Sequence, residues 1–263
     1  MIRPEFTWED LIAPMTDEAF MSTVKGKKAL VIRGDNFKKN FFSNITSWEQ
    51  ISQYVANDRA SAGLQVITPK GDKLCMEKGN CHNRPQPAWT KNDWYDKQLV
   101  GKMWGEGGSI ILTKASMMSP NMSAVGNALE ARFKNSAADA HFYCSGKKNA
   151  VSFETHADQD DNFLVHAIGR VHWKVYNVFA RSEIVAGRKK FTTRLTMTDK
   201  EASKYTPVID TILEPGDLLY IPSGMFHKAT PASARVSISV PLMENAGKRP
   251  IDRDYYDFEK NNS

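Results

Sequence analysis

The hydrophobic and polar positions of this chain follow one pattern in its first half and another in its second. In the first half, apolar residues recur at helical spacing, most regularly in residues 121–133, where Val125, Leu129 and Phe133 fall on nearly one face. Short β-prone runs such as residues 29–32 lie between the helical segments. The pattern predicts a mixture of helices and strands for this half.

In the second half, short β-like runs follow one another, separated by turns that carry Gly, Pro or Asp. The runs are residues 140–144, 162–166, 172–179, 191–196, 218–221 and 235–240. Short strands with such turns are typical of an antiparallel sandwich or barrel. The sequence therefore predicts a mainly β protein with flanking helices, of the α+β class.

The change of pattern also predicts the domain organisation. We expect a mixed helical part over residues 1–135, a β core over residues 136–245 and a C-terminal tail over residues 246–263. No Pro- or Ser-rich linker separates the first two parts. We therefore expect the N-terminal part to pack on the β core and to share its hydrophobic interior.

Composition narrows the class of protein and its compartment. A chain of 263 residues with 41% hydrophobic and 25% charged residues is an ordinary globular protein, not a disordered chain, a collagen or a coiled coil. No apolar run approaches the roughly 20 residues of a membrane-spanning helix, and the first ten residues lack the apolar segment of a secretory signal. Three cysteines, an odd number, argue against a disulfide framework. We expect a cytoplasmic protein.

The net charge of +5 does not identify a partner. Lysines and arginines are scattered in small groups, none as long as the about five to eight residues of a basic tract. Solvated lysine faces are the common outcome of such a distribution. Nucleic-acid binding therefore stays open but is not the favoured prediction.

A His-x-Asp pair in the β half offers two metal ligands. His156 and Asp158 are two residues apart, so on an extended strand both side chains point the same way and can reach one ion. Taken alone the pair is a weak signal, because a surface histidine beside a solvated aspartate is the more common outcome.

A second segment, residues 214–227, is more specific. Its Pro-Gly-Asp sequence predicts a tight turn, residues 218–221 form a buried strand, and a Pro-Ser-Gly turn then directs His227 inward. The plain alternative is a β-hairpin with a capping histidine. Taken with His156 and Asp158, however, the segment completes two imidazoles and one carboxylate. That set suits Fe(II) and leaves positions open for a bidentate cosubstrate and O₂, whereas a structural zinc site has a fourth ligand, commonly a thiolate.

The residues around these motifs carry a resemblance to a known family. After the His-x-Asp pair, residues 162–176 contain an apolar strand, a glycine, basic residues, a tryptophan and an apolar–aromatic pair. Residues 28–34 resemble the family's entry strand, and residues 108–112 with the helix at 121–133 resemble the stretch before its barrel. Over about residues 8–242 the chain resembles the JmjC/cupin-like Fe(II)- and 2-oxoglutarate-dependent oxygenases, most of all the ribosomal-oxygenase (cupin-4-like) branch.

The resemblance implies a fold, a chemistry and a partner. The fold would be a double-stranded β-helix, the jelly-roll barrel of cupins. His156, Asp158 and His227 would bind Fe(II), with 2-oxoglutarate as cosubstrate alongside O₂. The implied reaction is a hydroxylation of a protein or peptide side chain, with ribosomal proteins among the candidates, more than of a small molecule. Oligomeric state is not implied.

The chain departs from the family at one cosubstrate position. Fifteen residues after the first metal histidine the family usually has a Lys or Arg that pairs with the distal carboxylate of 2-oxoglutarate, and here that residue is Val171. A buried dicarboxylate needs a cation. Arg235 is the substitute we predict, with Ser237 on the same face of the strand and Tyr143 as a further hydroxyl. Lys174 is a weaker candidate.

Plainer interpretations of these residues exist. Arg235 would face solvent if it lay on an edge strand, a buried Tyr143 needs a hydrogen-bond partner in any case, and Trp173 is expected in the core.

Two other functions of the protein also remain open. One is a cupin-like module that binds metal without oxygenase turnover, which Val171 favours. The other is an RNA-modifying oxygenase of the same fold, which needs a basic groove at the mouth of the barrel.

Overall fold

The computed structural model describes residues 6–56, 64–75, 97–113, 115–117, 120–185 and 188–244, so the predicted tail over residues 246–263 lies outside the described residues. The helices are α1 (Trp8–Ile12), α2 (Asp17–Thr23), α3 (Asn36–Ser43), α4 (Trp48–Ala56), α5 (Lys97–Glu106), the 3₁₀ turn η2 (Ala115–Met117), α6 (Pro120–Arg132) and α7 (Asp199–Ala202). The strands before the barrel are β1 (Leu30–Ile32), β2 (Leu64–Ile67), β3 (Lys73–Cys75), β4 (Ser109–Leu112) and β5 (Ser136–Ala138).

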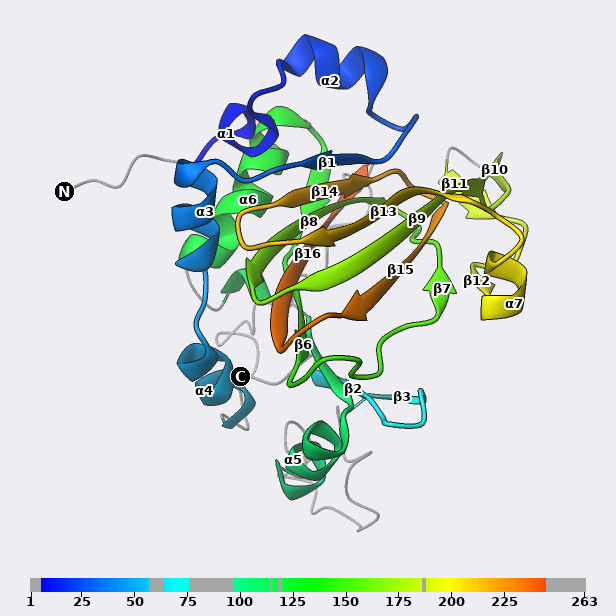
Figure 1. The fold of residues 1–263 in the computed structure, drawn as a ribbon. Helices are drawn as coiled ribbons and strands as arrows, with labels where there is room; N and C mark the ends of the chain where they lie inside the picture. Colours follow the sequence, from blue (N-terminus) through cyan, green and yellow to red (C-terminus); the bar gives the residue numbers. More distant parts are fainter. Residues whose placement is uncertain are drawn as a thin grey trace, which may run out of the picture.

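The remaining strands build the barrel and one insertion. They are β6 (His141–Ser145), β7 (Thr155–His156), β8 (Asp161–Ile168), β9 (Val171–Phe179), β10 (Ser182–Val185), β11 (Arg188–Phe191), β12 (Thr196–Met197), β13 (Pro207–Leu213), β14 (Leu218–Ile221), β15 (Met225–Pro231) and β16 (Arg235–Glu244). The larger sheet has the order β1-β14-β8-β16-β6-β4-β2-β3, with β5 paired to β16, and the smaller sheet has the order β12-β7-β15-β9-β13 (Figure 1).

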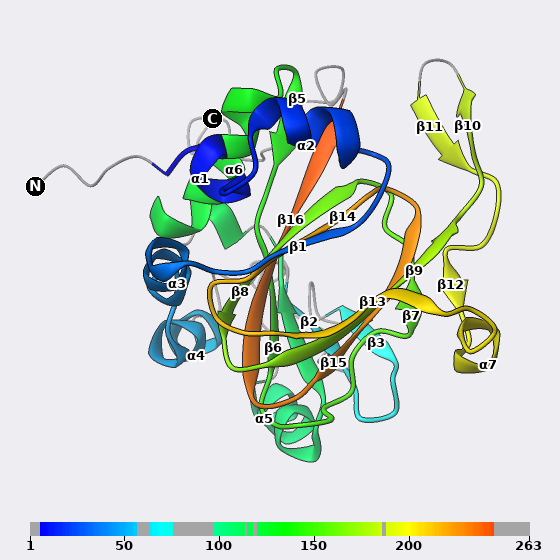
Figure 2. The ribbon, with the colours of Figure 1, turned by 45° about the horizontal axis from the view of Figure 1, so that its top comes forward.

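The two sheets form a double-stranded β-helix. The larger sheet contains β6, β8, β14 and β16, and the smaller sheet contains β7, β9, β13 and β15. Within each sheet, neighbouring strands of this set pair antiparallel. The turned view shows the two layers facing each other across the barrel interior (Figure 2). The predicted fold class, mainly β with flanking helices in a cupin-like barrel, is confirmed.

Strand alternation explains why both faces of β16 are buried yet chemically different. Val236, Ile238 and Val240 pack into the main hydrophobic cluster on the outer face of the larger sheet. Arg235 and the two serines that follow it at every second position point into the barrel. The predicted separation of the two faces of this strand is therefore found in the fold.

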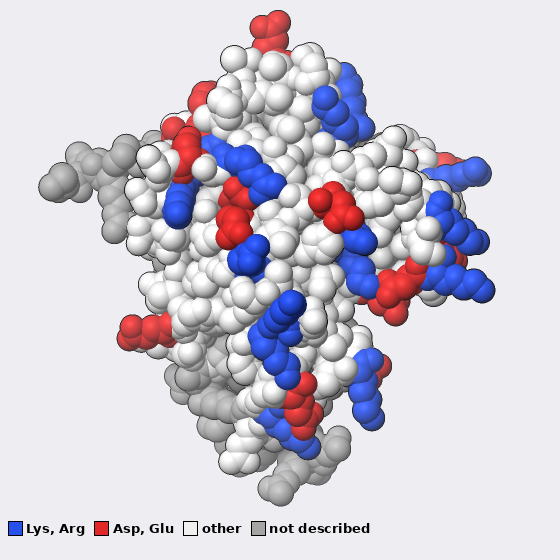
Figure 3. Space-filling model, viewed as in Figure 1, with Lys and Arg blue, Asp and Glu red and all other residues white. Residues whose placement is uncertain are grey.

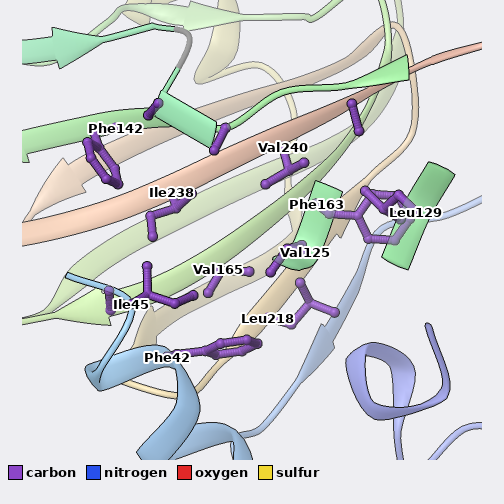
Figure 4. Packing of buried hydrophobic residues seen from close by; sticks show 14 of the residues in the cluster. Phe42, Ile45, Val125, Leu129, Phe142, Phe163, Val165, Leu218, Ile238 and Val240 are labelled. Carbon is purple, nitrogen blue, oxygen red and sulfur yellow. The ribbon is translucent and has the colours of Figure 1, made fainter. Parts of the chain in front are cut away.

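Helices α3 and α6 cover the outer face of the larger sheet, and the hydrophobic core lies between these helices and the sheet (Figure 4). Val125 and Leu129 of α6 are buried in one cluster with Phe163 of β8 and Val240 of β16. Phe42 of α3 belongs to the same cluster. Residues from both sides of the predicted boundary near residue 135 thus share one hydrophobic interior, as the missing linker suggests. No helix in the described part of the chain is long and apolar enough to span a membrane.

The structure differs from the predicted strands in the second half at two places. The run predicted at residues 191–196 is wrong as a single strand, because β11 ends at Phe191 and β12 begins at Thr196, with exposed residues between them. The hairpin β10–β11 extends away from the barrel (Figure 2). Strand β13 was not predicted, because Pro207 at its start and Asp210 within it weaken its β signal.

Candidate metal centre and its cavity

Three side chains from neighbouring strands of the smaller sheet meet inside the barrel. His156 ends β7, Asp158 follows two residues later, and His227 lies on β15 directly opposite His156 in the register. The turn before β15 contributes to this arrangement, because the amide of Gly224 donates a hydrogen bond to the carbonyl oxygen of Asp158 at 2.8 Å. Gly224 has φ of 82°, a conformation that favours glycine.

The distances within this cluster suit a single ion. Nε2 of His156 lies 3.7 Å from Oδ1 of Asp158, and Nε2 of His227 lies 3.5 Å from Oδ2 of Asp158. Two ligands that each lie about 2.1 Å from one ion, a typical bond length for imidazole or carboxylate, are roughly 3–4 Å apart. All the candidate ligand atoms lie within 4.8 Å of one another. The sequence-predicted triad is therefore brought together in space.

Hydrogen bonds to the backbone orient both imidazoles. Nδ1 of His156 lies 2.8 Å from the carbonyl oxygen of Glu154, and Nδ1 of His227 lies 2.9 Å from that of Met225. A carbonyl oxygen only accepts, so each Nδ1 carries the proton and each Nε2 keeps its lone pair. Both lone pairs are therefore available to an ion, as in metal-binding histidines with a backbone partner.

The carboxylate of Asp158 is supported by residues that sequence reasoning missed. The amide of Asn162 donates to Oδ2 of Asp158 at 3.0 Å, and the hydroxyl of Ser239 donates to Oδ1 of Asn162 at 2.8 Å. Burial alone would raise the pKa of Asp158, but the hydrogen bond with His227 and the neighbouring imidazoles hold that pKa well below its usual range. The only sequence signal for Asn162 was its place four residues after Asp158.

A cavity opens from this cluster into the barrel, and its lining includes the predicted cosubstrate residues Arg235, Tyr143 and Ser237. Arg235 is 2% exposed, so the alternative of a solvent-facing arginine on an edge strand is wrong. Lys174, the weaker candidate, lies 3.8 Å from Asp210 and does not line the cavity. Val171 is fully buried among apolar side chains.

Arg235 is a buried cation without an acidic partner among the described residues. Its Nη1 donates to the carbonyl oxygen of Tyr143 at 3.2 Å, and its Nε has no hydrogen-bond partner. Burial lowers the pKa of Arg235 to about 10, which leaves the guanidinium charged at neutral pH. A charge of this kind is costly unless an anion joins it. The donor set fits a carboxylate in the cavity.

Ser237 has a more specific environment than the sequence indicated. Nε2 of His166 lies 2.8 Å from the carbonyl oxygen of Gly169 and therefore carries a proton. Burial lowers the pKa of His166 to about 4, so the imidazole is neutral and its Nδ1 accepts the Ser237 hydroxyl at 3.0 Å. The Ser237 proton points to His166 in this arrangement, and a hydrogen bond from the Ser237 hydroxyl to a cosubstrate stays a prediction.

The Tyr143 hydroxyl is the other predicted contact to the cosubstrate. Burial raises the pKa of Tyr143, which remains a neutral hydroxyl.

This fold and cluster define a class, the cupin-like barrel proteins with a 2-His-1-carboxylate site inside the barrel. Residues 118–248 match the family model described as JmjC domain. The chain belongs to the JmjC-domain family.

Relatives and solved structures agree with this assignment. The chain is 26% identical over 242 residues to a protein of Aedes aegypti named bifunctional lysine-specific demethylase and histidyl-hydroxylase NO66, covering 91% of this chain and 34% of that protein. It is 27% identical over 225 residues to ribosomal oxygenase 1 of Danio rerio, covering 85% of this chain and 37% of that protein. This chain thus spans about a third of these curated relatives.

A solved structure shows the same fold at greater evolutionary distance. It is titled YcfD, a ribosomal oxygenase from Escherichia coli, in complex with cobalt and 2-oxoglutarate. The TM-score is 0.58 at 16% identity, with 92% of this chain and 54% of that chain covered. The likeness is one of fold, and it extends over nearly the whole of this chain.

Proposed function

We propose that the protein is an Fe(II)- and 2-oxoglutarate-dependent oxygenase that hydroxylates a protein side chain. The observation that carries this proposal is that one cavity is lined both by a cluster of metal ligands and by a buried cation. The histidine–aspartate cluster provides three ligand atoms for an ion, and buried Arg235 provides an unmatched positive charge. 2-Oxoglutarate has a chelating keto acid at one end and a second carboxylate at the other, so it matches both.

Each residue of the site has a stated task under this proposal. His156, Asp158 and His227 would bind Fe(II) through Nε2, a carboxylate oxygen and Nε2, and Arg235 would bind the distal carboxylate. When bound, iron supplies the activation of O₂ that couples hydroxylation to conversion of 2-oxoglutarate into succinate. The apolar side chain of Leu164 in the cavity lining helps to exclude water around these groups.

The substrate is proposed from the relatives. The names of two relatives contain histidyl-hydroxylase and ribosomal oxygenase. A side chain of a ribosomal protein is therefore the substrate we propose, with the reaction in the cytoplasm, where the buried free thiol of Cys144 would stay reduced.

Two other functions are weighed against this one. A module that binds metal without turnover is favoured by Val171. It does not explain, however, why a buried and charged Arg235 lines the same cavity without an acidic partner among the described residues. An RNA-modifying oxygenase needs a basic surface, and on the face shown in Figure 3 the Lys and Arg side chains are interspersed with Asp and Glu. The oxygenase that acts on protein remains the proposal.

The first prediction tests the metal centre. Purified protein supplied with Fe(II), ascorbate and 2-oxoglutarate should form succinate even without substrate, through uncoupled turnover. His156→Ala or His227→Ala should abolish succinate formation and weaken Fe(II) binding, because two ligands do not complete the site. Circular dichroism should show the fold retained.

A matched control is available on the same sheet. His172 lies on the outer face of β9 beside Asp210, so His172→Ala should keep wild-type turnover. Complete absence of succinate from metal-loaded wild-type protein would support the binding module instead. Full activity of either metal-site variant would refute the triad.

A further inference from the structure

Two N–H donors without partners line the cavity from opposite sheets. Only three buried side-chain polar atoms in the described residues lack a hydrogen-bond partner, namely Oγ1 of Thr155, Nε1 of Trp173 and Nε of Arg235. Trp173 comes from β9 of the smaller sheet and Arg235 from β16 of the larger sheet, and both line the cavity. Their side chains are only 5% and 2% exposed. Folded proteins rarely leave such donors unmatched, so a ligand that accepts hydrogen bonds is the natural partner.

We propose that the indole N–H of Trp173 is the second donor to the distal carboxylate of 2-oxoglutarate, beside Arg235. The inference rests on the proposed function, since it assigns a residue to the cosubstrate of that reaction. A carboxylate offers two oxygens and about four acceptor positions, more than one guanidinium edge uses. The keto acid end is held by the ion, so these two donors serve the far end.

The position of Trp173 on its strand explains why it can take this role. It lies two residues beyond Val171 on the same face of β9, so both side chains point into the barrel. Val171 packs in one cluster with Trp173 and Leu164 and holds the indole in place. Trp173 therefore lies one step of strand alternation from the position where the family usually has a cation.

A neutral donor also suits the charge of this site better than a second cation. Arg235 already places one buried positive charge against the cavity, and no acidic side chain of the described residues pairs with it. A lysine at residue 171 would add a like charge at the cost of a second desolvation. The indole N–H contributes a hydrogen bond without that cost. The distal carboxylate of the cosubstrate would then be bound by one positive charge, that of Arg235, and by one neutral donor, the indole N–H of Trp173.

The indole resonance of Trp173 provides a direct test in the whole protein. The protein is labelled with ¹⁵N-tryptophan and loaded with Zn(II), a diamagnetic substitute for iron, and Trp173→Phe identifies the Trp173 signal by its loss. Adding 2-oxoglutarate should move this N–H resonance downfield. Pyruvate, which has the keto acid but lacks the distal carboxylate, should leave it in place. The indole of Trp104, which lies on α5 and does not line the cavity, should not respond to either compound.

Calorimetry with the same metal gives an independent measure. Trp173→Phe removes the N–H and keeps an aromatic ring, and it should raise the Kd for 2-oxoglutarate roughly tenfold, the size expected for one hydrogen bond to a charged group. The Kd for pyruvate should not change, which separates a lost hydrogen bond from a disturbed cavity. Trp104→Phe is the matched control and should bind both compounds as the wild type does.

The possible failures have different meanings. If wild-type protein binds 2-oxoglutarate but the Trp173 resonance stays in place and Trp173→Phe binds equally well, the inference is wrong and the proposed function stands. A response of the same resonance to pyruvate places the contact at the keto acid end and also overturns the inference. If the Zn(II)-loaded wild type binds no 2-oxoglutarate, both the inference and the proposed function fail.

Discussion

At the scale of single residues, the site depends on groups whose environment is unfavourable until a ligand arrives. Arg235 is the clearest case, because its guanidinium is buried, charged and without an acidic partner among the described residues. Strand alternation predicted that Arg235 shares a face with Ser237, but the sequence left open whether that face points to solvent or into the barrel. The orphaned indole N–H of Trp173 was not predictable, because the sequence pattern assigns a tryptophan to the core and does not reveal which donors lack partners.

The second prediction concerns Arg235. Arg235→Ala should raise the KM for 2-oxoglutarate about a hundredfold or more, since removing one side of a buried charge pair costs roughly 3–5 kcal/mol. Arg235→Lys should recover only part of this, because an ammonium group does not reproduce a two-pronged contact. Iron affinity should stay near wild type. Steady-state kinetics and calorimetry measure the two quantities.

The same residue should show a conflict between stability and function. Arg235→Met removes a buried charge that has no acidic partner, so the cosubstrate-free protein should be more stable, by on the order of 1 kcal/mol. Addition of 2-oxoglutarate should then raise the Tm of the wild type and leave that of the variant unchanged. An unaltered KM in Arg235→Ala would instead leave the distal carboxylate with another partner.

At the scale of elements, the turns before β14 and β15 position the site, and the sequence predicted both. The Pro-Gly-Asp turn ends in Asp217, a buried carboxylate that accepts hydrogen bonds from the amides of Gly34 at 2.8 Å and Glu214 at 3.0 Å. Arg33 of the N-terminal part pairs with it at 2.6 Å. The hairpin β10–β11 was less predictable, because β periodicity does not tell whether a strand joins the barrel or extends from it.

The third prediction tests this turn. Asp217→Ala should lower the free energy of unfolding by about 3 kcal/mol, because it removes the buried carboxylate that accepts hydrogen bonds from two backbone amides and from one arginine. Urea denaturation measures the change. Glu214→Ala is the neighbouring control, since Glu214 is exposed and pairs only with Arg170 on the surface, which contributes about 0–1 kcal/mol. Equal losses in the two variants would show that the turn does not depend on the buried carboxylate.

At the scale of the whole molecule, the predicted boundary near residue 135 does not separate two cores. The N-terminal part adds β1 to one edge of the larger sheet and β4 to the other side, next to β6. Ion pairs of Lys25 join the parts as well, with its Nζ at 2.8 Å from buried Asp161 of β8 and 3.0 Å from exposed Glu244 of β16. A change of hydrophobic pattern marks a change of secondary structure, and in a sheet built from both parts it does not mark an independent unit.

The fourth prediction concerns these ion pairs and the unity of the fold. Lys25→Met leaves Asp161 buried beside Tyr220 without its cation, and it should lower the free energy of unfolding by roughly 3 kcal/mol at neutral pH. Burial alone would lower the pKa of Lys25, but Asp161 and Glu244 outweigh it and raise that pKa. A lysine whose pKa is higher in the folded state stabilises the protein fully below its unfolded pKa. The difference between wild type and variant should therefore shrink only at strongly alkaline pH, as the pH rises through the folded pKa of Lys25.

Unfolding by urea should remain a single transition in both proteins, because residues on both sides of residue 135 share one cluster. Fluorescence reports the six tryptophans, and circular dichroism in the far ultraviolet reports helices and strands; the two transitions should coincide. Lys28→Ala, at an exposed lysine three residues away, is the control and should leave the midpoint where it is. Two separated transitions, with Lys25→Met shifting only one of them, would show that residues 1–135 and 136–245 unfold as separate domains. One shifted transition would mean that the N-terminal part belongs to the same cooperative unit as the barrel that positions the metal centre.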